Sequence, residues 1–208
     1  MRQPVALAHA YRLLNHGPTV IVSAARHRAG QSPSDAIAAG QVNLMAAAWA
    51  MPLDFDPPKV AVVIDKATYT RELIEASGEF ALQLPCREQA DLTTTVGNTS
   101  GRELAQAGGE KFTALGLSTF EAECIGAPLL EGCVAWLECR VIPWPDLLRA
   151  HDLLLGEVLA AKADDRVFAH GRWQFDQADP GLRTLHHLSG GAYLLPGDQI
   201  AGRVTWPG

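Results

Sequence analysis

Two short apolar segments, joined by a proline-rich connection, constrain the fold of this chain most strongly. Residues 59–64 (KVAVVI) form a short, β-branched run that predicts a strand buried on both faces. Residues 41–50 (QVNLMAAAWA) predict a second strand, although their alanines favour it only weakly. Pro52, Pro57 and Pro58 predict that the connection between the two strands is a turn.

A short helix is predicted at residues 70–76, and its start is a candidate phosphate-binding site. The first turn of a helix leaves backbone N–H groups without partners and carries partial positive charge, so it attracts phosphate. Lys66, Thr68 and Thr70 lie at this start and would add donors to such a site. The alternative is structural: Thr70 is simply the N-cap, with Glu72 favourable in the first turn.

Further strands follow the same short pattern. Residues 19–24 (TVIVSA), 79–84, 132–142 and 153–161 are apolar or alternating runs with short connections. Few long helical patterns separate them, whereas a doubly wound sheet needs a helix between parallel strands. The sequence therefore predicts a mainly-β protein, either a β-barrel or an α+β domain.

Composition limits how many domains the chain can form and which classes of partner it can bind. The 208 residues are 48% hydrophobic and 19% charged, as expected for a single packed domain spanning residues 1–208. The net charge is −6 and no basic cluster occurs, which argues against nucleic acid or an anionic membrane as partner. No apolar run has the length needed to span a bilayer.

Localisation is predicted from the cysteines and the N-terminus. Cys86, Cys124, Cys133 and Cys139 lack C-x-x-C spacing and are predicted to be reduced, mostly buried thiols. Residues 1–17 interrupt their apolar positions with polar ones and make a poor signal peptide. We therefore predict a cytoplasmic protein.

Common catalytic motifs are absent: no G-x-S-x-G, H-E-x-x-H, G-x-G-x-x-G or Walker A run occurs. His186 and His187 are adjacent, so a strand would point them to opposite faces and no metal site is predicted. Cys86 has no neighbouring histidine and is not predicted to be a catalytic thiolate. Glu138 and Arg140 are interpreted as an ion pair on one strand face.

The segment 97–101 (GNTSG) has two interpretations. It would form a small anion-accepting loop next to Arg102 and Lys111, or it is an ordinary surface turn. Its spacing alone favours the surface turn.

Motifs across most of the chain, from about Gly17 to Gly197, carry a resemblance to a known family. In order they are the strand TVIVSA after Gly17-Pro18, then NLMAAAW, DPPKVAVVI, KATYTRELI with EFALQLP, TSGRELAQAGGEKF, GAPLLEGCVAWLECRV, HDLLLGEVLA and LHHLSGGAYLLPG. In this order they resemble the flavin reductase-like, FMN-binding split-barrel family, especially its flavoredoxin-like members.

The resemblance implies an antiparallel, Greek-key split barrel that forms a homodimer with FMN near the subunit interface. It assigns three groups of cofactor-binding residues: one beside the isoalloxazine and ribityl chain, one at the phosphate and one closing over the flavin. These are, respectively, Asn43, Leu44, Met45, Ala46, Ala47 and Trp49; Lys66, Thr68 and Thr70; and Ser100, Arg102, Lys111, His151 and Tyr193.

The chain departs from the family pattern in two places. Gln83 stands where an asparagine is common, and residues 46–48 are all alanine where hydroxyl residues are usual. Backbone N–H groups would have to replace the missing hydroxyl donors.

The resemblance implies an NAD(P)H-dependent flavin reductase, in which NADH or NADPH passes a hydride to flavin N5. Electrons would then pass to free flavin or to an electron-accepting protein partner. Because the chemistry belongs mainly to the cofactor, no catalytic residue is assigned. Two alternatives stay open: a non-enzymatic FMN-binding electron carrier, and a barrel that has lost its flavin.

Overall fold

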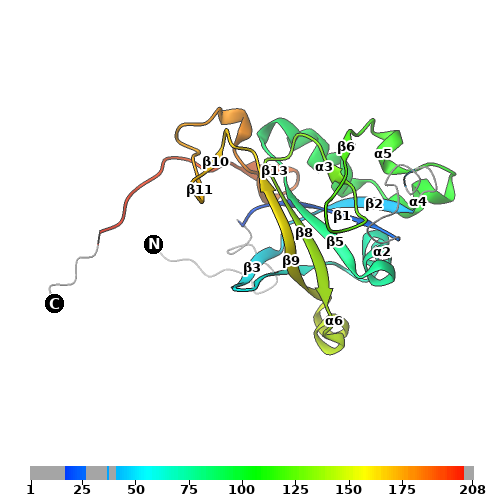
Figure 1. Cartoon of the computed structure of the whole chain (residues 1–208). Coiled ribbons are helices and arrows are strands. Elements are labelled where there is room, and N and C mark those ends of the chain that lie inside the picture. The colour runs from blue at the N-terminus through cyan, green and yellow to red at the C-terminus, as the bar shows by residue number, and fades with distance from the viewer. Residues whose placement is uncertain (1–16, 27–36, 38–40, 204–208) are drawn as a thin grey trace, which may run out of the picture.

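A seven-stranded antiparallel sheet dominates the structure, a computed structural model that describes residues 17–26, 37 and 41–203 (Figure 1). The prediction of a mainly-β protein is confirmed. In spatial order the strands are β2 (Val42–Ala47), β1 (Val20–Ala25), β5 (Glu79–Leu84), β8 (Ala135–Ile142), β9 (Leu153–Ala163), β4 (Pro58–Val63) and β3 (Ala50–Phe55).

The sheet curls because its two outermost strands are neighbours in sequence. β2 ends at Ala47 and β3 begins at Ala50, so only Ala48 and Trp49 join opposite edges of the sheet. A connection this short brings the edges together without pairing them in the sheet order. We call this junction, Ala48–Trp49, the seam.

The continuous apolar run of β1 reflects packing on both faces of the sheet. Val20, Val22 and Ala24 belong to the interior core with Phe80. The alternate residues Ile21 and Ala25 pack outside the curled sheet, in a second cluster with residues of α3 (Ala90–Asn98) and α5 (Lys111–Ala114). Strand periodicity sends successive side chains into two different cores, so both must be apolar.

The helices gather mainly beside β2 and at the sheet ends (Figure 1). α2 (Tyr69–Ser77) begins after the N-cap Thr68 and ends at Gly78, whose φ of 75° is a left-handed helix stop that glycine adopts without strain. The other elements are α4 (Gly101–Gln106), α6 (Pro145–His151), η2 (Arg87–Gln89), η3 (Pro180–Leu182), and the strand pairs β6 (Thr119–Phe120) with β7 (Leu129–Leu130), β10 (Phe168–Ala169) with β11 (Arg172–Trp173), and β12 (His186–Ser189) with β13 (Ala192–Leu194).

Three local predictions are wrong in whole or in part. The connection predicted as a turn contains strand β3, because an edge strand accepts Pro52 next to a register shift. The loop predicted at 97–101 is reduced to Thr99 and Ser100, since residues 97–98 end α3 and Gly101 starts α4. Glu138 does not pair with Arg140; its buried carboxylate accepts the backbone N–H groups of residues 123 and 124, and Lys162 lies 3.8 Å away.

All four cysteines are free thiols, as predicted. Burial raises the pKa of Cys86, which agrees with the prediction that it is no catalytic thiolate. No helix in the described part of the chain is long and apolar enough to cross a membrane. Residues 1–16, on which the signal-peptide prediction depends, lie outside the described residues.

Candidate functional site

Three adjoining hollows meet along β2. The seam hollow, about 620 Å³, is lined by residues 45–49, Val63, Asp65, residues 150–152, His187 and Ser189. The helix hollow, about 740 Å³, is lined by residues from β2, the start of α2, the α3–α4 junction and Lys111. A smaller hollow of about 300 Å³ lies between β2, α3 and β13. Ala46 lines all three, so together they form one cleft.

The start of α2 provides backbone donors to the helix hollow. Thr68 is the N-cap: its Oγ1 accepts from Arg71 N at 3.3 Å. The alternative in which Thr70 is the N-cap is therefore wrong. Thr70 lies one residue into the helix, fully buried, and its Oγ1 accepts from Asn43 Nδ2 at 2.9 Å. This hydrogen bond fixes the helix start against β2.

Gly101 leaves the space in which the Asn43 side chain reaches Thr70. A Cβ atom on Gly101 would lie 2.2 Å from Asn43 Oδ1 and 2.6 Å from its Cγ. Gly101 is the first residue of α4, directly after the N-cap Ser100. The close approach of α4 to β2 therefore depends on the absence of a side chain at this position.

Two arginines from distant segments share one carboxylate at the edge of the helix hollow. Glu72 lies 2.7 Å from Arg26 and 3.0 Å from Arg102, and both guanidinium groups lower the pKa of Glu72. The Arg102 guanidinium also lies 5.5 Å from the centre of the Tyr69 ring. Sequence reasoning missed Arg26 and Glu72, because no local pattern shows that the end of β1 meets α2 and α4.

Lys111 is a buried cation between two walls of the helix hollow. Its Nζ donates to Leu44 O and to Val96 O, each at 2.9 Å, while the residue is only 2% exposed. Burial lowers the pKa of Lys111 to about 8. The described residues provide no carboxylate within ion-pair distance of this ammonium, so it is solvated by backbone carbonyls alone.

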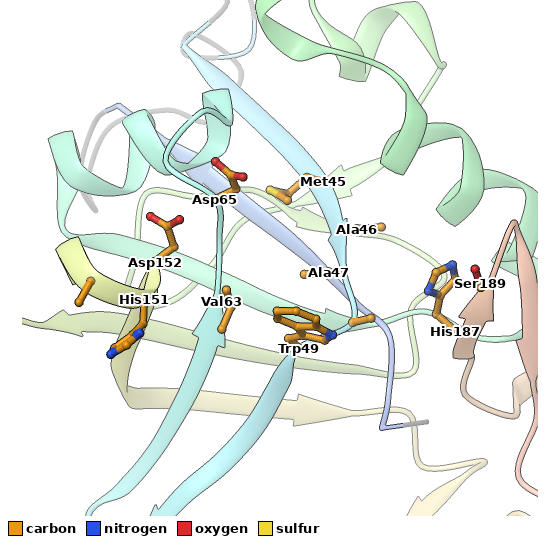
Figure 2. Close-up of a pocket in the computed structure, with 12 residues that line it drawn as sticks. Met45, Ala46, Ala47, Trp49, Val63, Asp65, His151, Asp152, His187 and Ser189 are labelled. Atoms are coloured by element: carbon orange, nitrogen blue, oxygen red, sulfur yellow. The ribbon is translucent and has the colours of Figure 1, made fainter. Parts of the chain in front are cut away.

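The seam hollow has a floor of small β2 residues and polar walls (Figure 2). Small residues of β2, Ala46 and Ala47, leave open surface beside the Trp49 ring. Asp65 and Asp152 lie on one side of this floor, and His187 and Ser189 lie on the opposite side. The His151 ring points away from the floor, so this residue contributes to the rim.

Most of the predicted site residues come together in this cleft. Leu44 and Lys66 do not line any of the three hollows: Leu44 is 1% exposed in the core, where only its carbonyl serves the site, and Lys66 is exposed. The predicted residues that line the cleft are Asn43, Met45, Ala46, Ala47, Trp49, Thr68, Thr70, Ser100, Arg102, Lys111, His151 and Tyr193.

Sequence reasoning also missed Asp65, Asp152 and His187 as lining residues. Asp65 follows β4, and Asp152 ends α6 with a positive φ of 53°. The two residues are far apart in the sequence, and only the tertiary fold brings both to the same hollow. His187 contacts the Tyr193 ring across the β12–β13 hairpin, with centroids 5.8 Å apart. No group of metal-binding side chains occurs in the described ranges.

Comparisons with known proteins agree with this architecture. A sequence model described as "Flavin reductase like domain" matches residues 12–179. The uncharacterized protein YddH of Escherichia coli K12 is 43% identical over 198 residues, covering 95% of this chain and 96% of its own.

Two solved structures give the fold. The FMN-binding domain of a flavin reductases-like enzyme from Shewanella baltica OS155 has a TM-score of 0.78 and 44% identity, covering 96% of both chains. Flavoredoxin of Desulfovibrio vulgaris (Miyazaki F) has a TM-score of 0.75 at 24% identity, covering 99% of this chain and 98% of its own. The prediction of a split barrel is confirmed, and the chain belongs to the flavin reductase-like family.

Proposed function

We propose that the cleft binds FMN and that the protein is an NAD(P)H-dependent flavin reductase or a related oxidoreductase. The observation that carries the proposal is the continuity of the two large hollows. One has helix-start donors and Arg102, which suit a phosphate, and the other has an alanine floor, which suits a ring system. The Shewanella baltica protein, 44% identical, is described as FMN-binding, which supports the proposal.

The residues present fit the cofactor. The N–H groups of the first turn of α2, with Thr68, Ser100 and Arg102, would hold the phosphate. Ala46 and Ala47 would lie against the isoalloxazine ring and let it approach the β2 backbone closely. When bound, FMN supplies hydride acceptance at N5 and onward electron transfer. The protein's part is to orient the ring and to leave one face open to the second reactant through the seam hollow.

An anaerobic titration tests this function. Purified protein should take up added FMN with a changed visible spectrum, and the bound flavin should bleach on adding NADH or NADPH. The nucleotide that bleaches it at the lower concentration is the donor. Bound flavin that neither nucleotide reduces would contradict the reductase and leave an electron carrier. A protein that takes up no FMN would contradict the whole proposal.

Arg102→Gln should weaken FMN binding about tenfold and leave riboflavin binding unchanged. The reason is that a hydrogen bond to a charged group contributes roughly 1.5–3 kcal/mol, and riboflavin has no phosphate to accept it. Fluorescence titration with the two flavins measures both affinities. Lys66→Gln is the matched control, because Lys66 does not line the cleft and its loss should change neither affinity. An equal loss for both flavins would contradict a phosphate role for Arg102.

We also propose that the protein is a homodimer that uses strand β3. Met51 is 58%, Leu53 47% and Phe55 92% exposed on this outermost strand, which forms an unusual apolar edge for an isolated chain. Phe55→Glu should convert dimer to monomer in sedimentation experiments, whereas Gln177→Glu, also exposed, should not. A wild-type protein that sediments as a monomer would contradict the dimer.

A further inference from the structure

The two large hollows differ in their charged lining residues. The helix hollow is lined by the cationic side chains of Arg102 and Lys111 and by the carboxylates of Asp65 and Glu103. Among the described residues that line the seam hollow there is no lysine or arginine, while Asp65 and Asp152 both line it. In Figure 2 these two carboxylates lie on the same side of the floor.

The backbone of Asp152 is fixed in place, and among the described residues its carboxylate has one neighbouring cation, Arg71. Its backbone N donates to Leu148 O at 3.1 Å and its carbonyl accepts from Ile64 N at 3.0 Å, which ties the end of α6 to the end of β4. Its Oδ1 is buried without a hydrogen-bond partner in the described part of the chain and lies 3.6 Å from the Arg71 guanidinium.

Arg71 offsets this charge only in part, because it also has a closer carboxylate partner. Its Nε lies 2.7 Å from Glu75 Oε1, and its NH1 donates to Ile64 O at 2.7 Å. One cation therefore faces two carboxylates, Glu75 and Asp152. Arg71 is 4% exposed and does not line the seam hollow, so a ligand there meets Asp152 rather than the guanidinium.

Asp65 adds a second fixed carboxylate. Its Oδ1 accepts from Ala67 N at 2.8 Å, and its carbonyl accepts from both the N and Oγ1 of Thr68. The turn that starts α2 thus holds Asp65 at the boundary between the two hollows.

We propose that the seam hollow selects a flat neutral or cationic ring, such as the neutral dihydronicotinamide ring of NAD(P)H, as the part of the second reactant that enters it, and rejects aryl carboxylates of the same shape, with Asp152 and Asp65 as the specificity-determining residues. This inference rests on the proposed function, in which FMN occupies the cleft. Two fixed negative charges repel an anion at short range, and the partly enclosed wall strengthens that repulsion relative to bulk water.

The test uses three probes that share one shape and differ in charge: benzamidine (cationic), benzamide (neutral) and benzoate (anionic). Each is titrated into the FMN-loaded protein, and binding is followed by the perturbation of the flavin spectrum. Benzamidine should bind at least tenfold more tightly than benzoate, with benzamide between them. Raising the salt concentration should reduce the benzamidine-to-benzoate ratio, because ions screen partly exposed charges.

Asp152→Asn should reduce the ratio of benzamidine to benzoate affinity about fivefold, by weakening the first and strengthening the second. Asparagine tolerates the left-handed backbone of this position, so the fold should be retained. Asp65→Asn should act in the same direction. Asp165→Asn, an exposed aspartate outside the seam hollow, is the control and should leave the ratio unchanged.

Each other outcome overturns a defined claim. Benzoate binding as tightly as benzamidine, a ratio unchanged in both cleft variants, or no spectral response to any probe overturns the charge selection. FMN uptake is measured first in the same sample. If the protein takes up no FMN, the proposed function fails and the inference fails with it, whereas normal uptake isolates the test of charge selection.

Discussion

Gly101→Ala will lower FMN affinity at least tenfold and destabilise the protein by about 1–3 kcal/mol, the usual cost of forcing extra volume into a packed site. The added Cβ would lie within 3 Å of three atoms of the Asn43 carboxamide, so the whole group has to move. Asn43 is 3% exposed and donates to the buried Thr70 at the start of α2. Displacing it therefore disturbs the helix start that we propose as the phosphate site.

Isothermal titration with FMN and urea unfolding measure the two effects. Gly109→Ala is the matched control, because its Cβ would meet only Leu104 O at 3.7 Å, an ordinary contact. Asn43→Ala in the Gly101→Ala background removes the obstructing group. The double variant should then be no less stable than Asn43→Ala alone. A Gly101→Ala variant that binds FMN as tightly as the wild type would contradict this role for the close approach.

The strands were predictable because their periodicity is local information. The β1 run is buried throughout, and β5 was predicted with the bounds it has in the structure. Strand β3 was missed because prolines normally disfavour strands, and nothing local reveals that Pro52 lies at a sheet edge where its missing N–H costs little. The junction of α3 and α4 was missed for a related reason. Glycine and serine indicate a break in regular structure, and a break of this kind can also join two consecutive helices.

The cleft was predictable in parts. Thr68, Thr70 and the alanines of β2 carry a local signal, since helix starts and small residues are visible in the sequence. Lys66 was included by the same signal, yet its side chain lies outside the cleft. Glu72, Arg26 and Asp152 come from three segments that only the curled sheet brings to one region, so no spacing rule could have placed them there.

Lys111 provides the second large effect, a pH-dependent gain in stability. The pKa of this lysine is about 8 in the folded protein, against an ordinary value of 10.5. Between these values the unfolded chain holds a proton that the folded chain has lost, so raising the pH favours folding. Below pH 8 both states are protonated, and the full cost of burying the ammonium is present. The gain from pH 8 to pH 10.5 amounts to about 3 kcal/mol, since one pKa unit corresponds to about 1.36 kcal/mol.

The comparison with Lys111→Met isolates this gain from the general effects of high pH. Methionine leaves Leu44 O and Val96 O without their donor, so the variant should be less stable than the wild type at every pH. The difference in free energy of unfolding should then grow as the pH rises from 7.5 to 10.5, because only the wild type sheds its buried charge. Urea unfolding at four pH values in that range measures it, with Lys66→Met as the exposed-lysine control. A wild-type advantage that stays constant or shrinks with rising pH would mean that the ammonium of Lys111 is well solvated by its two carbonyls, and that its burial costs the fold little.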